Sequence, residues 1–98
     1  MSLMDALFYW LQMKLVSDSR PDDEAARDTA AFFAQILSED HELTSFEVVK
    51  AEDAKIHVAY RKADGTGRTV WFDREAAEQL FRTPVLSREE KALKEQES

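Results

Sequence analysis

The segment 4–16, MDALFYWLQMKLV, is apolar on two opposite sides when it is drawn as a helix. At about 100° per residue its apolar side chains form two stripes, roughly back to back. The first stripe consists of Met4, Leu7, Phe8, Leu11 and Leu15, and the second of Ala6, Tyr9, Trp10, Met13 and Val16. The first stripe can pack on the rest of a small domain. The second then needs another cover, which could be a second subunit, a partner, or a sheet folding back over it.

Length and charge restrict the class of protein. The 98 residues, 44% of them hydrophobic, predict a single packed domain. Thirteen basic and twenty acidic residues give a net charge of −7, which repels phosphate backbones, so we expect no nucleic-acid ligand. The chain has no cysteine, which excludes disulfides and thiolate metal sites and is typical of a cytoplasmic protein.

The apolar segment near the start does not read as a targeting signal or a membrane span. Asp5 stands where a secretory signal has positive charge, and thirteen residues fall short of the about 20 that cross a bilayer. Residues 1–3, which precede a second methionine, read as a remnant of an expression vector. We therefore expect one domain over 4–84 and a polar tail, helical or mobile, over 85–98.

Two further helices are predicted. The second helix spans about 21–38, with Pro21 at a first helical position and acidic residues in its first turn. Its apolar residues share one face, and alanines there permit close antiparallel packing against the segment 4–16. The third helix spans 74–82, with Asp73 as its N-cap.

From Phe46 onward the hydrophobic period changes to two, which predicts strands over 46–51, 55–62 and 68–72. Short connections make them an antiparallel meander. A three- or five-residue loop at the second turn pairs Tyr60 with Val70 and Val58 with Phe72, leaving Trp71 on the other face. A two-residue Asp-Gly turn would instead pair Val58 with Trp71. The predicted fold is α+β in the order α-α-β-β-β-α, with helices mainly on one face of the sheet.

Motifs for catalysis or metal binding are not found. The acidic run around His41 lacks metal-ligand spacing, and His57 alternates with apolar residues on a strand. The DGTG sequence fails the calcium-loop template and reads as a hairpin turn. No serine lies in a nucleophile elbow. We therefore expect no metal and no cofactor.

The leading hypothesis is a small, non-catalytic, cytoplasmic interaction or regulatory module that forms a homodimer through the N-terminal helix. The expected interface residues are Ala6, Tyr9, Trp10, Met13, Val16 and Trp71. The simplest structural alternative is that both apolar surfaces belong to one closed core. A second functional hypothesis is a small-molecule binder or enzyme, with a pocket between sheet and helices lined by His57, Tyr60 and Trp71. A third is peripheral membrane attachment, which the acidic balance opposes.

Overall fold

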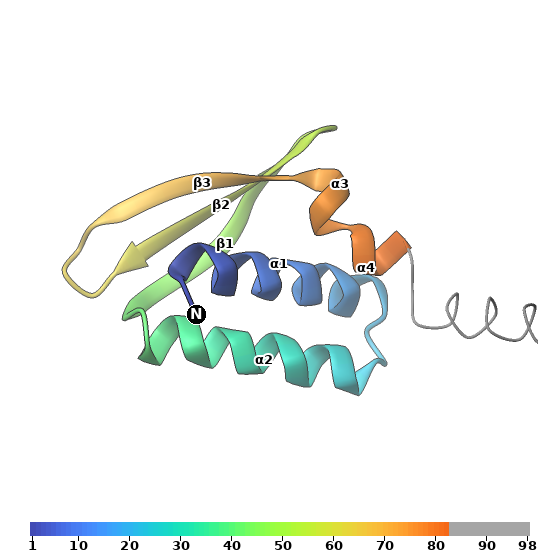
Figure 1. Cartoon of the computed structure of the whole chain (residues 1–98), viewed down its shortest axis with the longest axis horizontal. Helices are drawn as coiled ribbons and strands as arrows, with labels where there is room; N and C mark the ends of the chain where they lie inside the picture. The colour runs from blue at the N-terminus through green and yellow to red at the C-terminus, as the bar shows by residue number, and fades with distance from the viewer. Residues whose placement is uncertain (83–98) are drawn as a thin grey trace, which may run out of the picture.

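A computed structural model describes residues 1–82 of the chain (Figure 1). Its elements are α1 (Leu3–Ser19), α2 (Glu24–Glu39), β1 (Leu43–Ala51), β2 (Lys55–Lys62), β3 (Gly67–Asp73), α3 (Arg74–Ala77) and α4 (Gln79–Arg82). The three strands form an antiparallel sheet in the order β1-β2-β3. The predicted α+β fold and element order are confirmed. The tail predicted over 85–98 lies outside the described residues.

Helix α1 lies between the sheet and α2 (Figure 1). Leu7 and Leu11 of the first stripe are fully buried in a cluster with Ile56 and Val58 of β2. On the second stripe the ring of Tyr9 lies 5.5 Å from that of Phe33 on α2. A helix with two apolar sides thus occupies the middle layer of the domain. The second stripe is covered within the same chain, Tyr9 by Phe33 of α2 and Trp10 by Phe46 of β1.

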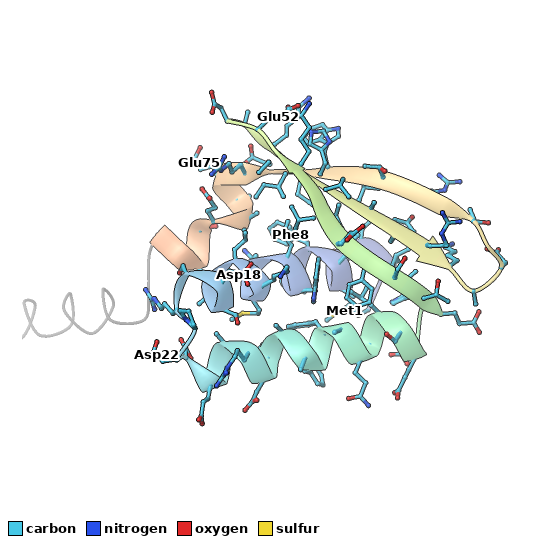
Figure 2. The ribbon with its side chains drawn as sticks, turned by 180° about the vertical axis from the view of Figure 1, so that it is seen from behind. Met1, Phe8, Asp18, Asp22, Glu52 and Glu75 are labelled. Carbon is cyan, nitrogen blue, oxygen red and sulfur yellow. The ribbon has the colours of Figure 1, made fainter. Side chains whose placement is uncertain are left out.

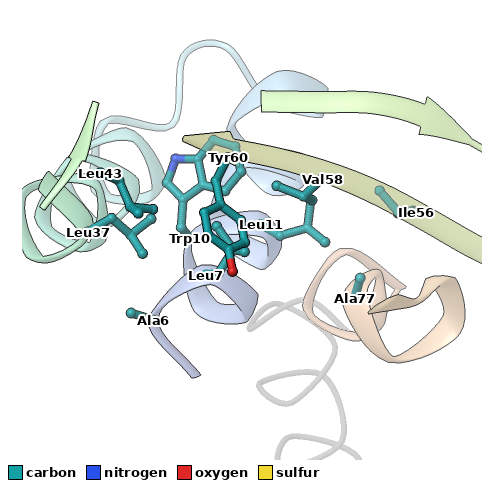
Figure 3. Close-up of a cluster of buried hydrophobic side chains, with 10 residues drawn as sticks. All are labelled: Ala6, Leu7, Trp10, Leu11, Leu37, Leu43, Ile56, Val58, Tyr60 and Ala77. Atoms are coloured by element: carbon teal, nitrogen blue, oxygen red, sulfur yellow. The ribbon is translucent and has the colours of Figure 1, made fainter. Parts of the chain in front are cut away.

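The main core lies between α1 and the inner face of the sheet, the face directed toward α1. Figure 3 shows Trp10 and Leu11 of α1 beside Tyr60 and Val58 of β2. The buried cluster is completed by residues of α1, α2, β1, β2 and α3: Ala6, Leu7, Leu37, Leu43, Ile56 and Ala77. Because the cluster draws on α1, α2, the sheet and α3, these elements form one packed unit.

Both long helices begin at capping side chains. Ser2 is the N-cap of α1, and its Oγ accepts from the Asp5 N–H at 3.1 Å, so a residue assigned to a vector remnant takes part in the helix start. Asp23 is the N-cap of α2, and its Oδ1 accepts from the Ala26 N–H at 3.0 Å. The predicted helical position of Pro21 is wrong. Pro21 lies in a turn that the Asp23 N–H closes on the Arg20 carbonyl at 2.9 Å.

The second hairpin turn has a three-residue loop, residues 63–65. The Gly65 N–H donates to the Lys62 carbonyl at 3.0 Å, the Lys62 N–H donates to the Thr66 carbonyl at 2.8 Å, and Gly65 has φ of 90°. This loop pairs Val58 with Val70 and Tyr60 with Arg68. The predicted pairs, Val58 with Phe72 and Tyr60 with Val70, are therefore wrong by two residues, because they require the five-residue loop. A shift of two leaves every side chain on its predicted face. Trp71 lies on the outer face.

The C-terminal helix is interrupted. Asp73 Oδ2 accepts from the Ala76 N–H at 2.9 Å, which confirms the predicted N-cap. The single helix predicted over 74–82 is wrong, because Glu78, with φ of −90° and ψ of 3°, separates α3 from α4. Gln12 Nε2 donates to the Ala76 carbonyl at 3.2 Å and fastens α1 to α3.

Candidate functional site

The predicted interface residues of α1 differ widely in accessibility. Ala6 and Val16 are buried, and Trp10 keeps 6% of its surface exposed, with its ring edge-on to Phe46 of β1 at 5.0 Å. Met13 is half-buried, while Tyr9 is 42% exposed. Ala6, Trp10 and Val16 therefore contribute to the domain's own interior. Tyr9 has the most surface of the five for contact with a partner.

Tyr9 belongs to a row of five neighbouring aromatic rings, which we call the aromatic strip. In order along the row they are Phe32, Phe33, Tyr9, Phe8 and Phe72, with successive centroid distances of 5.3, 5.5, 6.1 and 5.5 Å. The strip runs from α2 across α1 to β3, and Figure 2 shows Phe8 between α1 and the sheet. Phe32, at its α2 end, is 57% exposed. The strip is a continuous row of rings from three elements, in which Tyr9 and Phe32 are exposed and the other three are partly buried.

Strand β3, where the strip ends, is an edge of the sheet and pairs with β2 alone among the described strands. Two hydrogen bonds show which residues of β3 face β2. The Lys62 N–H donates to the Thr66 carbonyl at 2.8 Å, and the Arg74 N–H donates to the Ala54 carbonyl at 2.9 Å. Even-numbered residues of β3 direct backbone groups toward β2, so Thr69 and Trp71 direct theirs toward the free edge. The aromatic strip therefore adjoins a strand that offers unpaired backbone donors and acceptors.

The outer face of the sheet carries a second cluster. Trp71 is 55% exposed and lies across from His57, and Lys55 Nζ lies 4.4 Å from the Trp71 ring centroid. Lys50 Nζ lies 2.9 Å from Glu52 Oε1, and His57 Nε2 lies 3.6 Å from Glu52 Oε2. The hydrogen bond from Lys50 and then the neighbouring His57 ring hold the pKa of Glu52 below its ordinary value. His57 Nε2 is itself buried without a hydrogen-bond partner.

The predicted pocket residues are not brought together. Tyr60 is buried on the inner face, whereas His57 and Trp71 lie on the outer face. The physical reason is strand alternation, because positions 57 and 60 have opposite parity and point to opposite faces. Sequence reasoning placed Tyr60 on the inner face and Trp71 on the other, yet assigned both to one pocket.

A hollow of about 290 Å³ lies elsewhere, where the end of α1 meets α3, lined by Leu15, Asp18, Ser19 and Glu78. It contains none of the predicted pocket residues. Within residues 1–82 no three side chains of His, Cys, Asp or Glu gather as a metal site requires. No helix in that same range has the length and apolar character to cross a bilayer.

Comparison with known proteins gives no relative, since no family model, curated protein or solved structure matches the chain. The functional interpretation therefore rests on the surfaces described above. Of these, the aromatic strip carries two exposed rings, Tyr9 and Phe32. The sequence places Phe32 among the apolar residues of the second helix but does not indicate it as a contact residue. Phe32 sits beside the apolar face of the second helix, and its link to Tyr9 through Phe33 exists only once the two helices are packed.

Proposed function

We propose that the protein is a small, non-catalytic interaction module that associates with a second copy of itself through the aromatic strip. The observation that supports this most strongly is the exposure of Tyr9 and Phe32, at 42% and 57%, on a row of touching rings. Aromatic side chains are enriched at protein interfaces, because they bring large apolar area at a low cost in side-chain entropy.

The residues proposed to contact the second copy differ from those expected from the sequence. Trp10 packs edge-on against Phe46 inside the domain, so it is unavailable to a partner without loss of the fold. Tyr9 and Phe32 take its place as anchors. Withdrawing on the order of 100 Å² of apolar area per ring contributes about 2.5 kcal/mol, at about 25 cal/mol per Å². Four rings in a dimer then contribute about 10 kcal/mol, comparable with the roughly 4–15 kcal/mol cost of association. The strip by itself supports a weak dimer.

The test is the oligomeric state of a double variant, Tyr9→Ser with Phe32→Ser. We expect the wild-type chain to dimerise between about 10 μM and about 1 mM in light scattering after size exclusion. The double variant should be monomeric over the same range, with an unchanged circular dichroism spectrum. Val49→Ser is the matched control, because Val49 is also an exposed apolar residue but lies on β1, away from the strip. A monomeric wild type, or a double variant that still dimerises, contradicts the proposal.

A second candidate function, small-molecule binding, is favoured by the outer-face cluster. His57 Nε2 is buried without a hydrogen-bond partner, next to the exposed ring of Trp71 and the ammonium of Lys55. The accessible groups of this cluster suit a planar anion that stacks on the indole and pairs with the Lys55 ammonium. A thermal-shift series with aromatic carboxylates tests this candidate. Stabilisation that Trp71→Ala abolishes supports it, and no shift with any member contradicts it.

A further inference from the structure

We propose that two copies associate by antiparallel pairing of their β3 strands, which joins two three-stranded sheets into one sheet of six strands. This inference rests on the proposed self-association and specifies its geometry. Strand β3 pairs with β2 without a register shift from Gly67 to Asp73. Its outward backbone groups, those of Gly67, Thr69 and Trp71, are the donors and acceptors that a second strand requires.

The other edge of the sheet is less suited to pairing. Strand β1 has register irregularities between Leu43 and Ser45 and between Val48 and Lys50. Such bulges twist an edge and interrupt its row of backbone groups, which is a common protection against edge-to-edge association. Strand β3 contains neither a bulge nor a proline nor a lysine. Because the β1 edge is interrupted and the β3 edge is not, we place the pairing of the two copies at β3.

Symmetry gives this pairing a specific register. A two-fold axis through Val70 places Thr69 of one copy opposite Trp71 of the other, in the hydrogen-bonded positions. On the inner face Val70 then meets its own counterpart. Arg68 of one copy comes opposite Phe72 of the other, where a guanidinium can lie over the ring. The strand is therefore complementary to itself in backbone groups and in side chains.

The same axis brings the aromatic strips together. A two-fold axis perpendicular to the sheet leaves both helical layers on one face of the joined sheet. Phe72 lies on β3 and Phe8 lies beneath it on α1, with the two rings 5.5 Å apart. The strip thus begins at the seam and continues along the side that faces the second copy. One partner covers both the open edge and the exposed rings.

Charge favours an interface that is centred on the sheets of the two copies. Residues 1–42 contain three basic and nine acidic side chains, whereas residues 43–73 contain five of each. Two acidic helical layers repel one another, while two sheet regions of zero formal charge do not. An antiparallel seam along β3 joins the neutral parts of the two copies.

Thr69→Pro tests the seam directly. Proline removes the outward N–H of Thr69, which is not part of the β2–β3 ladder, and prolines are tolerated on edge strands at such positions. We expect Thr69→Pro to be monomeric in light scattering and to keep the circular dichroism spectrum of the wild type. The matched control is Thr69→Val, which keeps the N–H and the branched shape and should dimerise like the wild type.

Amide hydrogen exchange on the wild-type chain provides a second measurement that needs no variant. The N–H groups of Thr69 and Trp71 should exchange about tenfold more slowly, or slower still, in the dimer than in dilute monomer. A dimer in which both amides exchange as fast as in the monomer overturns the β3 seam, whatever the proline variant does. If Thr69→Pro unfolds, this measurement decides the question.

The outcomes separate the two proposals. Loss of the dimer in Thr69→Pro, with protection of both amides in the wild type, supports the seam. A dimer that survives Thr69→Pro but is lost in the Tyr9 and Phe32 double variant overturns the seam and supports the strip alone. A wild-type chain that is monomeric up to about 1 mM overturns both.

Discussion

At the scale of single residues, the environments of Tyr9 and Trp10 show how one helical step separates interior from surface. The two are adjacent on the second stripe, yet Trp10 points toward Phe46 of β1 while Tyr9 lies at the margin against Phe33 of α2. Trp71, the other tryptophan, lies on the outer face with Lys55 over its ring. The two tryptophans therefore have different physical roles, one in packing and one on the surface.

The first prediction compares these tryptophans. Trp10→Ala removes a ring that is almost fully enclosed, so it should lower the free energy of unfolding by about 3–5 kcal/mol in urea titration. Trp71→Ala should lower it by about 1 kcal/mol or less, because most of that ring already contacts water. Equal losses of unfolding free energy from the two substitutions would show that burial of the Trp10 ring adds no more stability than the exposed Trp71 ring does.

The second prediction concerns pH. The pKa of Glu52 is lowered from 4.5, so its carboxylate adds stability that is present above about pH 4.5 and is lost as the pH falls through the folded-state pKa. The urea midpoints of wild type and Glu52→Gln should therefore differ near neutral pH and converge in acid. Lys50→Met removes the main cause of the lowered Glu52 pKa, so its urea midpoint should also converge with that of the wild type in acid. A midpoint difference that is independent of pH contradicts this assignment.

At the scale of elements, the sequence predicted the order and type of the two long helices and the three strands, and the faces of the strands, because the hydrophobic period changes from helical to alternating near Phe46. It predicted α2 beside α1 and offered the sheet as a cover of the second stripe, which fits Trp10 against Phe46, but it did not identify α2 as the cover of Tyr9. The close approach depends on small side chains such as Ala26, which α2 buries, and on the angle at which the helices cross. Helix crossing is a property of two packed surfaces, and no local pattern specifies it.

The register of the strands is likewise not fixed by the local hydrophobic pattern. Loops of three and five residues differ by two in register, so both keep Val58 and Val70 on the inner face. The alternating pattern therefore predicts which side Trp71 occupies without fixing its partner. The partner is set by the turn at Gly65, whose positive φ closes the shorter loop.

The third prediction tests that turn. Gly65→Ala forces a side chain into the left-handed region at φ of 90° and should cost about 1–2 kcal/mol of unfolding free energy. Gly67→Ala is the matched control two residues away. A Cβ there meets its nearest neighbour, an atom of Arg61, at an ordinary 3.7 Å. Thermal or urea unfolding should show a loss for the first variant and little change for the second.

At the scale of the whole molecule, charge and exposed rings are distributed unequally. The acidic residues concentrate in residues 1–42, and the exposed rings are Tyr9 on α1, Phe32 on α2 and Trp71 on the outer face of the sheet. The sequence indicated Tyr9 and Trp71 as candidate contact residues. It did not indicate Phe32 or the free edge of β3, because both become surfaces only after the layers assemble.

The fourth prediction follows from the net charge of −7. Two copies repel one another most strongly at low ionic strength, where the screening length is about 30 Å at 0.01 M. Self-association should therefore strengthen when NaCl is raised toward about 0.5 M, measured as a lower dimer dissociation constant in sedimentation equilibrium. A dimer that weakens with salt would indicate an interface held by opposite charges instead of aromatic rings.

The middle position of α1 also has a consequence for biosynthesis. Helix α1 is translated before the elements that enclose it, α2 on one side and the meander on the other. Until β3 has been made, Leu7 and Leu11 lack their full set of neighbours. A nascent chain of this design postpones its collapse until nearly the whole domain has emerged, and in the meantime it presents an apolar helix to chaperones.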